Sequence, residues 1–376
     1  MKQKTNYLIY SKWGYGHAVR MIAIIRELLT DSKMEYPISI FTHPNSRRFI
    51  NDSLNQNQVN IHDLFYEFYK DKAIERHNFL DENADHLKKW ENSLLITDFV
   101  MQTKYLRHLK NVFFAGIIDS DLAIIHDDDD EIRRWKKLAK ELIDELDLVF
   151  NVNILSTEPN LPNVIKIPPI VRKITREPAE IKKKLGLSAD ENFALYYTGV
   201  KGVKWEYKYH LDIESALQLW DLSIPLVIIH GLGANSEEVI FNGDKFINVP
   251  YDPEGQDYVN AAEFIVAKPG MSLFSECIAY KTPILMCKAD HSETELKSQI
   301  YKRILGDISP PILESFDPIS VYSQIDYLFS IKGNIQNSFR DIICNGAEIA
   351  ARAFRQIDES LLSKQPRNKI LESLIR

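Results

Sequence analysis

Short apolar runs alternate with longer amphipathic stretches along this chain of 376 residues. This order predicts repeated β-α-β units, in which the strands are parallel and helices cover the sheet. A single hydrophobic core rarely grows beyond about 250–300 residues, so we expect two such domains. The expected strands of the first half are Asn6–Tyr10, Pro37–Thr42, Ser93–Thr97, Val112–Ile118 and Leu148–Val152, and its expected helices are Ala18–Leu29 and Trp135–Leu146.

A proline-rich stretch, Thr157–Pro178, separates this half from a second alternating series. Prolines at this density are typical of an interdomain connector. The second series is expected to form strands Phe193–Tyr197, Leu226–Ile229, Phe246–Val249, Phe264–Val266 and Ile284–Met286, with helices Ile181–Leu185, Ile213–Leu219, Leu273–Tyr280 and Thr294–Leu305. The segments Ile342–Leu362 and Lys369–Ile375 are also expected to be helical. We therefore predict an N-terminal domain (residues 1–157), a connector (158–178), a second domain (179–340) and C-terminal helices (341–376).

Composition restricts the partners and the cellular setting. The formal net charge of −7 argues against nucleic acid as the main partner. The three cysteines, Cys277, Cys287 and Cys344, form no CxxC pair and favour a reducing, cytoplasmic location. A membrane span would need a run of about 18 apolar residues, and we expect none. The oligomeric state is not predicted by the sequence.

The first candidate site is the segment Gly14-Tyr15-Gly16-His17, between an expected strand and an expected helix. Glycines let a ligand approach the backbone, and a helix N-terminus offers amide donors to an anion. His17 could take a proton from a bound hydroxyl near neutral pH, or it could only cap the helix. Arg20 could pair with a phosphate or a carboxylate, or could form a surface ion pair without a role.

The second candidate site is the turn Lys268-Pro269-Gly270-Met271-Ser272. Gly270 would allow close approach, Ser272 is expected to cap the following helix, and the amides behind it would cradle an anion. Glu276, one turn further, could bind the paired hydroxyls of a ribose, or could belong to a capping arrangement without any ligand. Two more glycine loops follow strands of the same domain and are either parts of this site or plain turns: Thr198-Gly199-Val200-Lys201-Gly202 and His230-Gly231-Leu232-Gly233.

Together these motifs resemble those of the GT-B glycosyltransferases, and within them the MurG-type, family 28-type N-acetylglucosaminyltransferases of cell-wall synthesis. The similar blocks follow the same order along nearly the whole chain: Gly14–Arg20, Ala261–Val266, Pro269–Ser272 with Glu276, Pro283, and Asn345–Ala347 with Ala350-Ala351. The resemblance implies an α/β protein with two Rossmann-like, doubly wound domains facing a cleft. It also implies C-terminal helices that cross back to the first domain.

The resemblance assigns roles to the candidate residues. His17 would be the general base on the acceptor hydroxyl, and Gly14, Gly16 and Arg20 would bind substrate or nucleotide. The diphosphate would lie on Pro269, Gly270, Met271 and Ser272, the ribose on Glu276, and the base near Val249–Tyr251. The loop that contains Thr198, Gly199 and Lys201 would face the phosphates or the donor sugar, and Gly231 and Gly233 would line the donor pocket. No metal or other cofactor is expected, because helix ends and basic side chains can neutralise the leaving diphosphate.

Two departures from that group leave the donor open. Lys12-Trp13-Gly14 replaces a longer glycine-rich loop, and the residues that contact the donor sugar are replaced by a segment in which Glu293 or Glu295 would act. The leading hypothesis is an inverting, metal-independent hexosyl or N-acetylhexosaminyl transfer from a nucleotide-diphosphate sugar, expected to be a UDP-sugar, to an acceptor hydroxyl. A lipid acceptor would bring the protein to a membrane surface.

Two alternatives remain open. The Gly-x-Gly-His-x-x-Arg segment also resembles the UDP-sugar hydrolases of nonulosonic acid synthesis, in which the same histidine would activate water. A non-catalytic partner that keeps a nucleotide-sugar pocket is the second alternative. The three hypotheses differ in whether a sugar is released and in whether it reaches an acceptor.

Overall fold

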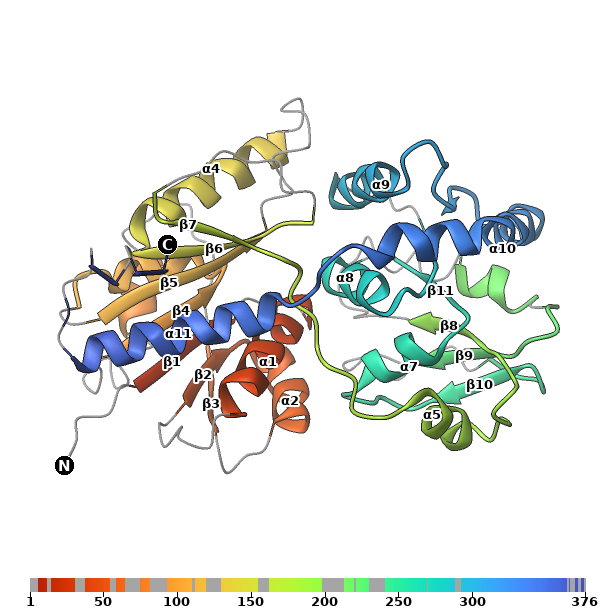
Figure 1. The fold of residues 1–376 in the computed structure, drawn as a ribbon, viewed down its shortest axis with the longest axis horizontal. Coiled ribbons are helices and arrows are strands. Elements are labelled where there is room, and N and C mark those ends of the chain that lie inside the picture. The colour runs from red at the N-terminus through yellow and green to blue at the C-terminus, as the bar shows by residue number, and fades with distance from the viewer. Residues whose placement is uncertain are drawn as a thin grey trace. The chain divides into compact units, whose positions relative to one another are not determined.

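The computed structural model describes residues 6–11, 15–30, 38–54, 59–64, 75–81, 93–109, 112–119, 130–154, 162–197, 213–219, 221–229, 241–268, 270–287, 292–363, 365, 369–370 and 373–374. The chain forms two compact units. Unit 1 contains Met1–Ile170 and Asn345–Arg376, and unit 2 contains Val171–Cys344. Figure 1 shows that each unit is built on its own sheet with helices packed against it.

Unit 1 contains a parallel sheet of seven strands in the order β3-β2-β1-β4-β5-β6-β7. The strands are β1 (Asn6–Ser11), β2 (Ile38–Thr42), β3 (Val59–Asp63), β4 (Ser93–Asp98), β5 (Val112–Asp119), β6 (Leu148–Val152) and β7 (Val164–Ile167). The five predicted strands are confirmed. Sequence reasoning missed β3, which carries polar residues, and β7, which lies between the prolines of the expected connector.

The helices of unit 1 cover both faces of this sheet (Figure 1). Leu142 of α4 (Asp130–Glu145) packs with Leu8, Leu95 and Val149 on one face. Phe354 of α11 (Gly346–Leu362) meets Phe150 edge-on from the other, where α11 also packs against α1 (Tyr15–Leu29). All six residues of β4 are buried, as expected for a strand that is covered on both faces of the sheet. The remaining elements are α2 (Pro44–Ser53), the 3₁₀ helix η1 (Met101–Leu106) and a helical turn at 75–81.

The contact between α11 and α1 confirms that the C-terminal helix returns to the first domain. The helix begins at Gly346 rather than at the predicted Ile342. The amide of Gly346 donates to the carbonyl of Pro169 at 3.1 Å, and a Cβ at position 346 would lie 2.1 Å from the carbonyl oxygen of Pro168. Glycine is therefore required there, and this close approach sets where the helix starts.

Unit 2 contains a parallel sheet of six strands in the order β10-β9-β8-β11-β12-β13. The strands are β8 (Ala194–Tyr197), β9 (Leu226–Ile229), β10 (Phe246–Val249), β11 (Phe264–Ala267), β12 (Ile284–Cys287) and β13 (Ile312–Leu313). The helices are α5 (Pro178–Lys184), α7 (Gly255–Ala261), α8 (Met271–Tyr280), α9 (Ser292–Leu305) and α10 (Pro318–Arg340), with a further helical segment at 213–217.

Both sheets have the strand order of Rossmann-like, doubly wound domains, as the alternating pattern predicts. Sequence reasoning missed α10, although Asp317 and Pro318 mark its start. The Asp317 carboxylate accepts a hydrogen bond from the Ser320 amide at 3.0 Å, and Pro318 occupies the first helical position, where no amide donor is needed.

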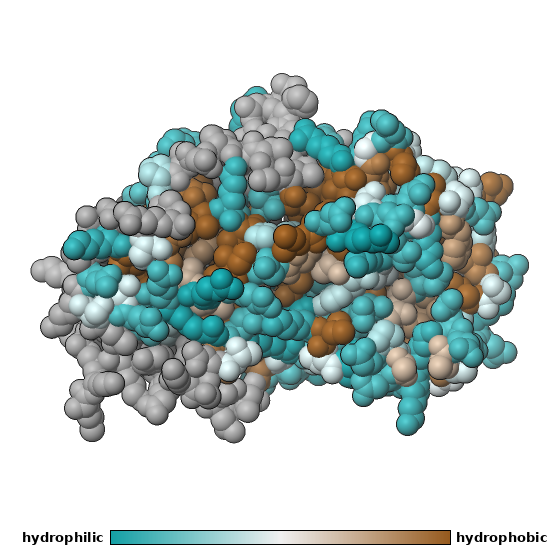
Figure 2. Space-filling view, viewed as in Figure 1, coloured by the Kyte–Doolittle hydropathy of each residue, from teal (hydrophilic) through white to brown (hydrophobic). Residues whose placement is uncertain are grey.

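The stretch 158–178, expected to be a connector, contains β7 and then enters unit 2 at Val171. In the described ranges, no helix is long and apolar enough to cross a membrane. Figure 2 shows hydrophilic residues, in teal, over much of the described surface on the face viewed, with hydrophobic residues, in brown, among them.

Candidate functional site

A buried aspartate that sequence reasoning missed, Asp98, lies at the carboxyl end of β4. Its side chain is 0% exposed, and it pairs in register with Ser11, the last residue of the neighbouring strand β1. The carboxyl ends of parallel strands are where doubly wound sheets bind ligands. The available signal was an acidic residue directly after an apolar strand, but nothing local indicated its partners.

Those partners are His17 and Arg20, in the first turns of α1. The helix begins at Tyr15, so His17 lies in its first turn. We had expected the helix to begin at Ala18 and His17 to lie in the loop before it. His17 Nδ1 lies 2.9 Å from Asp98 Oδ1. Arg20 donates from Nη2 to Asp98 Oδ1 at 2.8 Å and from Nε to Oδ2 at 3.2 Å. Residues three apart on a helix share one face, so both side chains reach the same carboxylate.

The charges around Asp98 keep it ionised although it is buried. Burial by itself would raise the pKa of a carboxyl group, because it penalises the charged form. The charges of Arg20 and His17 and their hydrogen bonds outweigh this effect, so the pKa of Asp98 lies below its usual value. Asp98 is thus a permanent acceptor at neutral pH, and the Nδ1–H of His17 is its natural donor.

The turn after Asp98 is strained. Phe99 has φ of 57°, in the left-handed region that a bulky residue rarely adopts. Its ring is buried among Tyr10, Phe41 and Leu95 in the core cluster. The turn is closed by the Val100 amide, which donates to Thr97 Oγ1 at 3.1 Å. Packing and hydrogen bonding on both sides of Asp98 therefore fix the direction of its carboxylate.

This arrangement is suited to proton transfer. When Nδ1 carries the proton and donates to Asp98, the second ring nitrogen, Nε2, is the one that can accept a proton. The His17 side chain is 23% exposed, whereas its aspartate partner is inaccessible. A carboxylate that orients a partly exposed imidazole is the geometry of a general base.

The second candidate site in unit 2 begins at Gly270. Gly270 is the residue before the first turn of α8, with φ of −77° and ψ of 149°. Ser272 does not cap the helix, contrary to our prediction, because the helix starts at Met271 and places Ser272 inside the first turn, where it is buried. The backbone amides at this N-terminus still point out of the helix, and the Phe274 amide already bonds the Gly270 carbonyl at 2.9 Å.

Glu276 forms a buried ion pair with Arg172, a residue that sequence reasoning assigned only to the connector. Arg172 donates from Nε to Oε1 at 2.8 Å and from Nη2 to Oε2 at 3.2 Å. The two residues are 3% and 2% exposed, respectively. Each carboxylate oxygen can accept a second hydrogen bond, so this pair leaves the predicted ribose contact of Glu276 chemically open.

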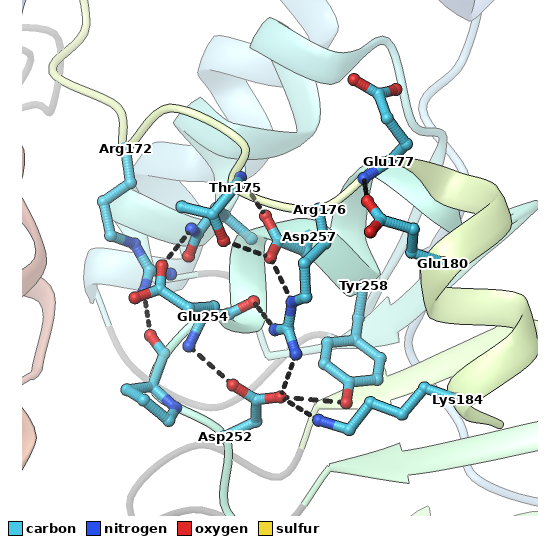
Figure 3. Close-up of polar contacts among 12 residues, drawn as sticks. Arg172, Thr175, Arg176, Glu177, Glu180, Lys184, Asp252, Glu254, Asp257 and Tyr258 are labelled. Atoms are coloured by element: carbon cyan, nitrogen blue, oxygen red, sulfur yellow. Dashed lines mark hydrogen bonds and ion pairs between the residues drawn. The ribbon is translucent and has the colours of Figure 1, made fainter. Parts of the chain in front are cut away.

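Arg172 belongs to a set of residues that we call the clamp: Arg172, Thr175, Arg176 and Lys184 (Figure 3). Arg176 donates to Asp257 at 2.7 Å and to Asp252 at 3.0 Å, and Lys184 donates to Asp252 at 2.7 Å. Burial opposes ionisation of Asp252, but the bonds from Arg176 and Lys184 outweigh it and lower its pKa. The clamp therefore ties the first residues of unit 2 to the loop and helix that follow β10.

The other predicted site residues are only partly located by the structure. Gly16 is exposed in the first turn of α1, and Met271 begins α8. Glu293 and Glu295 lie at the start of α9, and their side chains fall outside the described residues. The rest also fall outside them: Gly14, Thr198, Gly199, Lys201, Gly231, Gly233 and Pro269. Among the described side chains, no group of three or more histidine, cysteine, aspartate or glutamate residues is placed to hold a metal ion.

Solved structures similar to this chain are sugar-transferring enzymes. A UDP-glucosyltransferase from Polygonum tinctorium that glucosylates indoxyl matches with a TM-score of 0.63 and 12% identity, over 96% of this chain and 99% of that one. The glycotransferase of kitacinnamycin matches with a TM-score of 0.61 and 10% identity, over 94% and 99%. The calicheamicin glycosyltransferase CalG4 matches with a TM-score of 0.59 and 14% identity, over 96% and 99%.

Similarity in sequence is more limited. L-arabinokinase of Arabidopsis thaliana is 24% identical over 140 residues, which are 36% of this chain and 12% of that protein. No family model matches the chain. At these identities the structural matches establish the fold, and that fold is GT-B: two Rossmann-like units with a C-terminal helix that returns to the first.

Proposed function

We propose that this protein is a glycosyltransferase that moves a sugar from a nucleotide-diphosphate sugar to an acceptor hydroxyl. The observation that carries the proposal is the 2.9 Å contact between His17 Nδ1 and Asp98 Oδ1 at the carboxyl edge of the unit 1 sheet. Through Nε2, His17 would take the proton of the acceptor hydroxyl. The resulting oxygen would attack the anomeric carbon of the donor sugar as the bond to the diphosphate breaks.

Unit 2 supplies the nucleotide-binding part of the proposal. The amides at the start of α8 would accept the charge that develops on the leaving diphosphate, and Glu276 would bind the ribose. Gly270 supports this role, because a Cβ there would meet no described atom within 4 Å and its backbone conformation suits any residue. Neither the backbone conformation nor the packing within the protein requires a glycine at this position. The absence of a side chain would therefore serve the close approach of a ligand.

The finer parts of the proposal concern the donor and the stereochemistry. We propose a UDP-sugar as donor, in keeping with the UDP-glucosyltransferase among the structural matches. A single displacement by the activated hydroxyl would invert the anomeric centre. Metal independence and the resemblance to the MurG-type group also belong to the proposal. Addition of EDTA should leave the rate unchanged, and NMR of the first product should show the inverted anomer.

The direct test is a transfer assay with UDP-, GDP- and dTDP-sugars and a panel of hydroxylated acceptors. His17→Ala should lower turnover by roughly 100-fold or more, because a general base contributes at least that factor. His108→Ala is the matched control, since His108 is an exposed histidine of unit 1 whose Nδ1 lies 2.8 Å from the carbonyl oxygen of Tyr105, three residues away. Unchanged turnover in His17→Ala would remove His17 from the mechanism.

Hydrolysis of the donor is the second candidate, and the same His17–Asp98 geometry favours it, because the imidazole could activate water instead of an acceptor. The two reactions differ in their products. Free sugar released from the donor without any acceptor, at a rate that added acceptors do not change, would identify a hydrolase. Sugar found on the acceptor would identify a transferase.

A further inference from the structure

We propose that Arg20 is a positioning residue for the base: its guanidinium holds Asp98 so that His17 keeps its proton on Nδ1. This inference rests on the proposed function, in which His17 acts through Nε2. The sequence alone left Arg20 open as a phosphate ligand, a carboxylate ligand or a surface ion pair. In the structure Arg20 is 6% exposed and its Nε and Nη2 are both bonded to Asp98.

Three polar atoms lie close together and determine which nitrogen of His17 carries the proton: Asp98 Oδ1, His17 Nδ1 and Arg20 Nη2. Asp98 Oδ1 lies 2.9 Å from His17 Nδ1 and 2.8 Å from Arg20 Nη2, and Nη2 lies 3.0 Å from Nδ1. Arginine can only donate and an ionised carboxylate can only accept, so Nδ1 decides the pattern. With a proton on Nδ1, both nitrogens donate to Oδ1. Without a proton on Nδ1, this nitrogen could accept a hydrogen bond from Arg20. Its lone pair would then face the carboxylate oxygen, and two acceptors repel each other.

The first pattern is the stable one, because hydrogen bonds to an ionised acceptor are about twice as strong as neutral ones. The arginine fork contributes in two ways. Its charge compensates Asp98, which is 0% exposed and would otherwise be costly to keep ionised. Its planar, two-point attachment through Nε and Nη2 prevents the carboxylate from rotating, so Oδ1 stays directed at Nδ1. Asp98 therefore sets the proton position and Arg20 fixes Asp98.

The spacing of the residues explains why both reach one oxygen. His17 and Arg20 lie three residues apart on α1, so they are neighbours on one helix face. Arg20 is buried at the carboxyl end of β4, next to the strained turn at Phe99, while His17 on the same helix face stays partly exposed. The His-x-x-Arg spacing is then a unit with one function: one side chain carries the proton and the other holds its acceptor.

The test reads the proton position directly. In protein labelled with ¹⁵N-histidine, long-range ¹H–¹⁵N correlation spectra report which ring nitrogen carries the proton, and the loss of one signal in His17→Ala assigns His17. We expect Nδ1–H in the wild type, a mixture of both tautomers in Arg20→Gln, and partial recovery of Nδ1–H in Arg20→Lys, which keeps the charge but not the fork. Arg26→Gln, which removes another α1 arginine that bonds the Ser53 carbonyl, should retain Nδ1–H.

Kinetics provide the second readout. Arg20→Gln should lower kcat by about tenfold to 100-fold with little change in the donor KM, since a small misplacement of a catalytic group has an effect of this size. A loss confined to the donor KM would show that Arg20 binds the donor, and would overturn the proposal. An unchanged tautomer in both Arg20→Gln and Arg20→Lys would also overturn it. If Arg20→Gln does not fold, Arg20→Lys decides. If the wild type transfers no sugar from any donor tested, the proposed function fails. The NMR spectra would still test the role of Arg20, because they report the His17 tautomer without any substrate.

Discussion

Units 1 and 2 each bury an arginine fork on a carboxylate, and the two forks differ in the third group that they serve. In unit 1, Arg20 shares the oxygen Oδ1 of Asp98 with His17, whose side chain is partly exposed. In unit 2, Arg172 bonds both oxygens of Glu276, and both side chains are inaccessible. The comparison teaches that a buried ion pair by itself indicates no chemistry. A partly exposed titratable group beside it does, because that group can exchange a proton with a substrate.

The two forks also differ in the origin of the arginine. Arg20 comes from the helix that follows the first strand of its own sheet, 78 residues before Asp98. Arg172 comes from the first residues of unit 2 and joins Glu276, 104 residues later, to the clamp. In the function that we propose, the unit 1 fork acts on the base His17, whereas the unit 2 fork fixes where the chain enters its unit. The following predictions separate these two roles.

The largest effect is expected from breaking the unit 2 fork. Arg172→Gln should lower the free energy of unfolding by about 3–5 kcal/mol, because it leaves the buried charge of Glu276 without its partner. The double variant Arg172→Met with Glu276→Leu should recover most of that loss, since apolar residues of similar volume often replace a buried pair without cost. Urea titration of both variants measures the difference. Equal stability of Arg172→Gln and wild type would show that the pair is not buried in solution.

Asp98→Asn tests the unit 1 fork through its pH dependence. It should cost about 1.5–3 kcal/mol near neutral pH, the range for a hydrogen bond to a charged group. The folded pKa of Asp98 lies below that of an unfolded aspartate, about 3.9. The stabilising contribution is therefore present above about pH 4 and lost as the pH falls through the folded pKa. The stability gap between wild type and Asp98→Asn should narrow on acidification, as read by urea titrations between pH 7 and 3.

Asp252 provides the matched control from unit 2, because its pKa is lowered in the same direction by Arg176 and Lys184. Asp252→Asn should show the same narrowing of the stability gap in acid. It should leave the His17 tautomer unchanged, whereas Asp98→Asn should alter it. A gap that widens in acid for either variant would contradict the assigned direction of its pKa.

Substitutions of two glycines distinguish a role in packing from a role in the close approach of a ligand. Gly346→Ala should destabilise unit 1 by about 1–3 kcal/mol, because the new methyl group would meet the backbone carbonyl of Pro168. Gly270→Ala should change stability by less than about 0.5 kcal/mol, as expected at an uncrowded position. It should nevertheless weaken UDP binding, measured by calorimetry. Tight UDP binding by Gly270→Ala would remove the close approach that we propose at α8.

The smallest effect is expected at Lys281, which, like Phe99, is a described residue other than glycine with positive φ. Lys281 ends α8 in the left-handed conformation that glycine adopts without strain. Lys281→Gly should therefore stabilise unit 2 by about 1 kcal/mol, seen as a higher Tm. Phe99→Gly should destabilise unit 1 instead, since the relief of strain is smaller than the loss of a buried aromatic side chain. Destabilisation by Lys281→Gly would show that its side chain has a structural role.

The amino-acid sequence by itself determined the fold class, and it supplied the residues from which both candidate sites are proposed. Alternating apolar runs predict the central strands of both sheets, because a strand buried on both faces must be apolar along its length. The glycine-histidine segment and the Gly270 turn were visible for the same reason: they directly follow such strands. Edge strand β3, which carries polar residues, and β7, which is enclosed by prolines, lack that signal, and sequence reasoning missed both.

Only the tertiary structure decided which groups meet. Asp98 and Arg172 are ordinary charged residues in their local sequence, and their partners lie 78 to 104 residues away. The start of α8 likewise moved the expected cap from Ser272 to Gly270. Local patterns report how each segment buries its apolar side chains. Which charges then come together depends on strand order and register, and those arise from contacts between segments that no single segment contains.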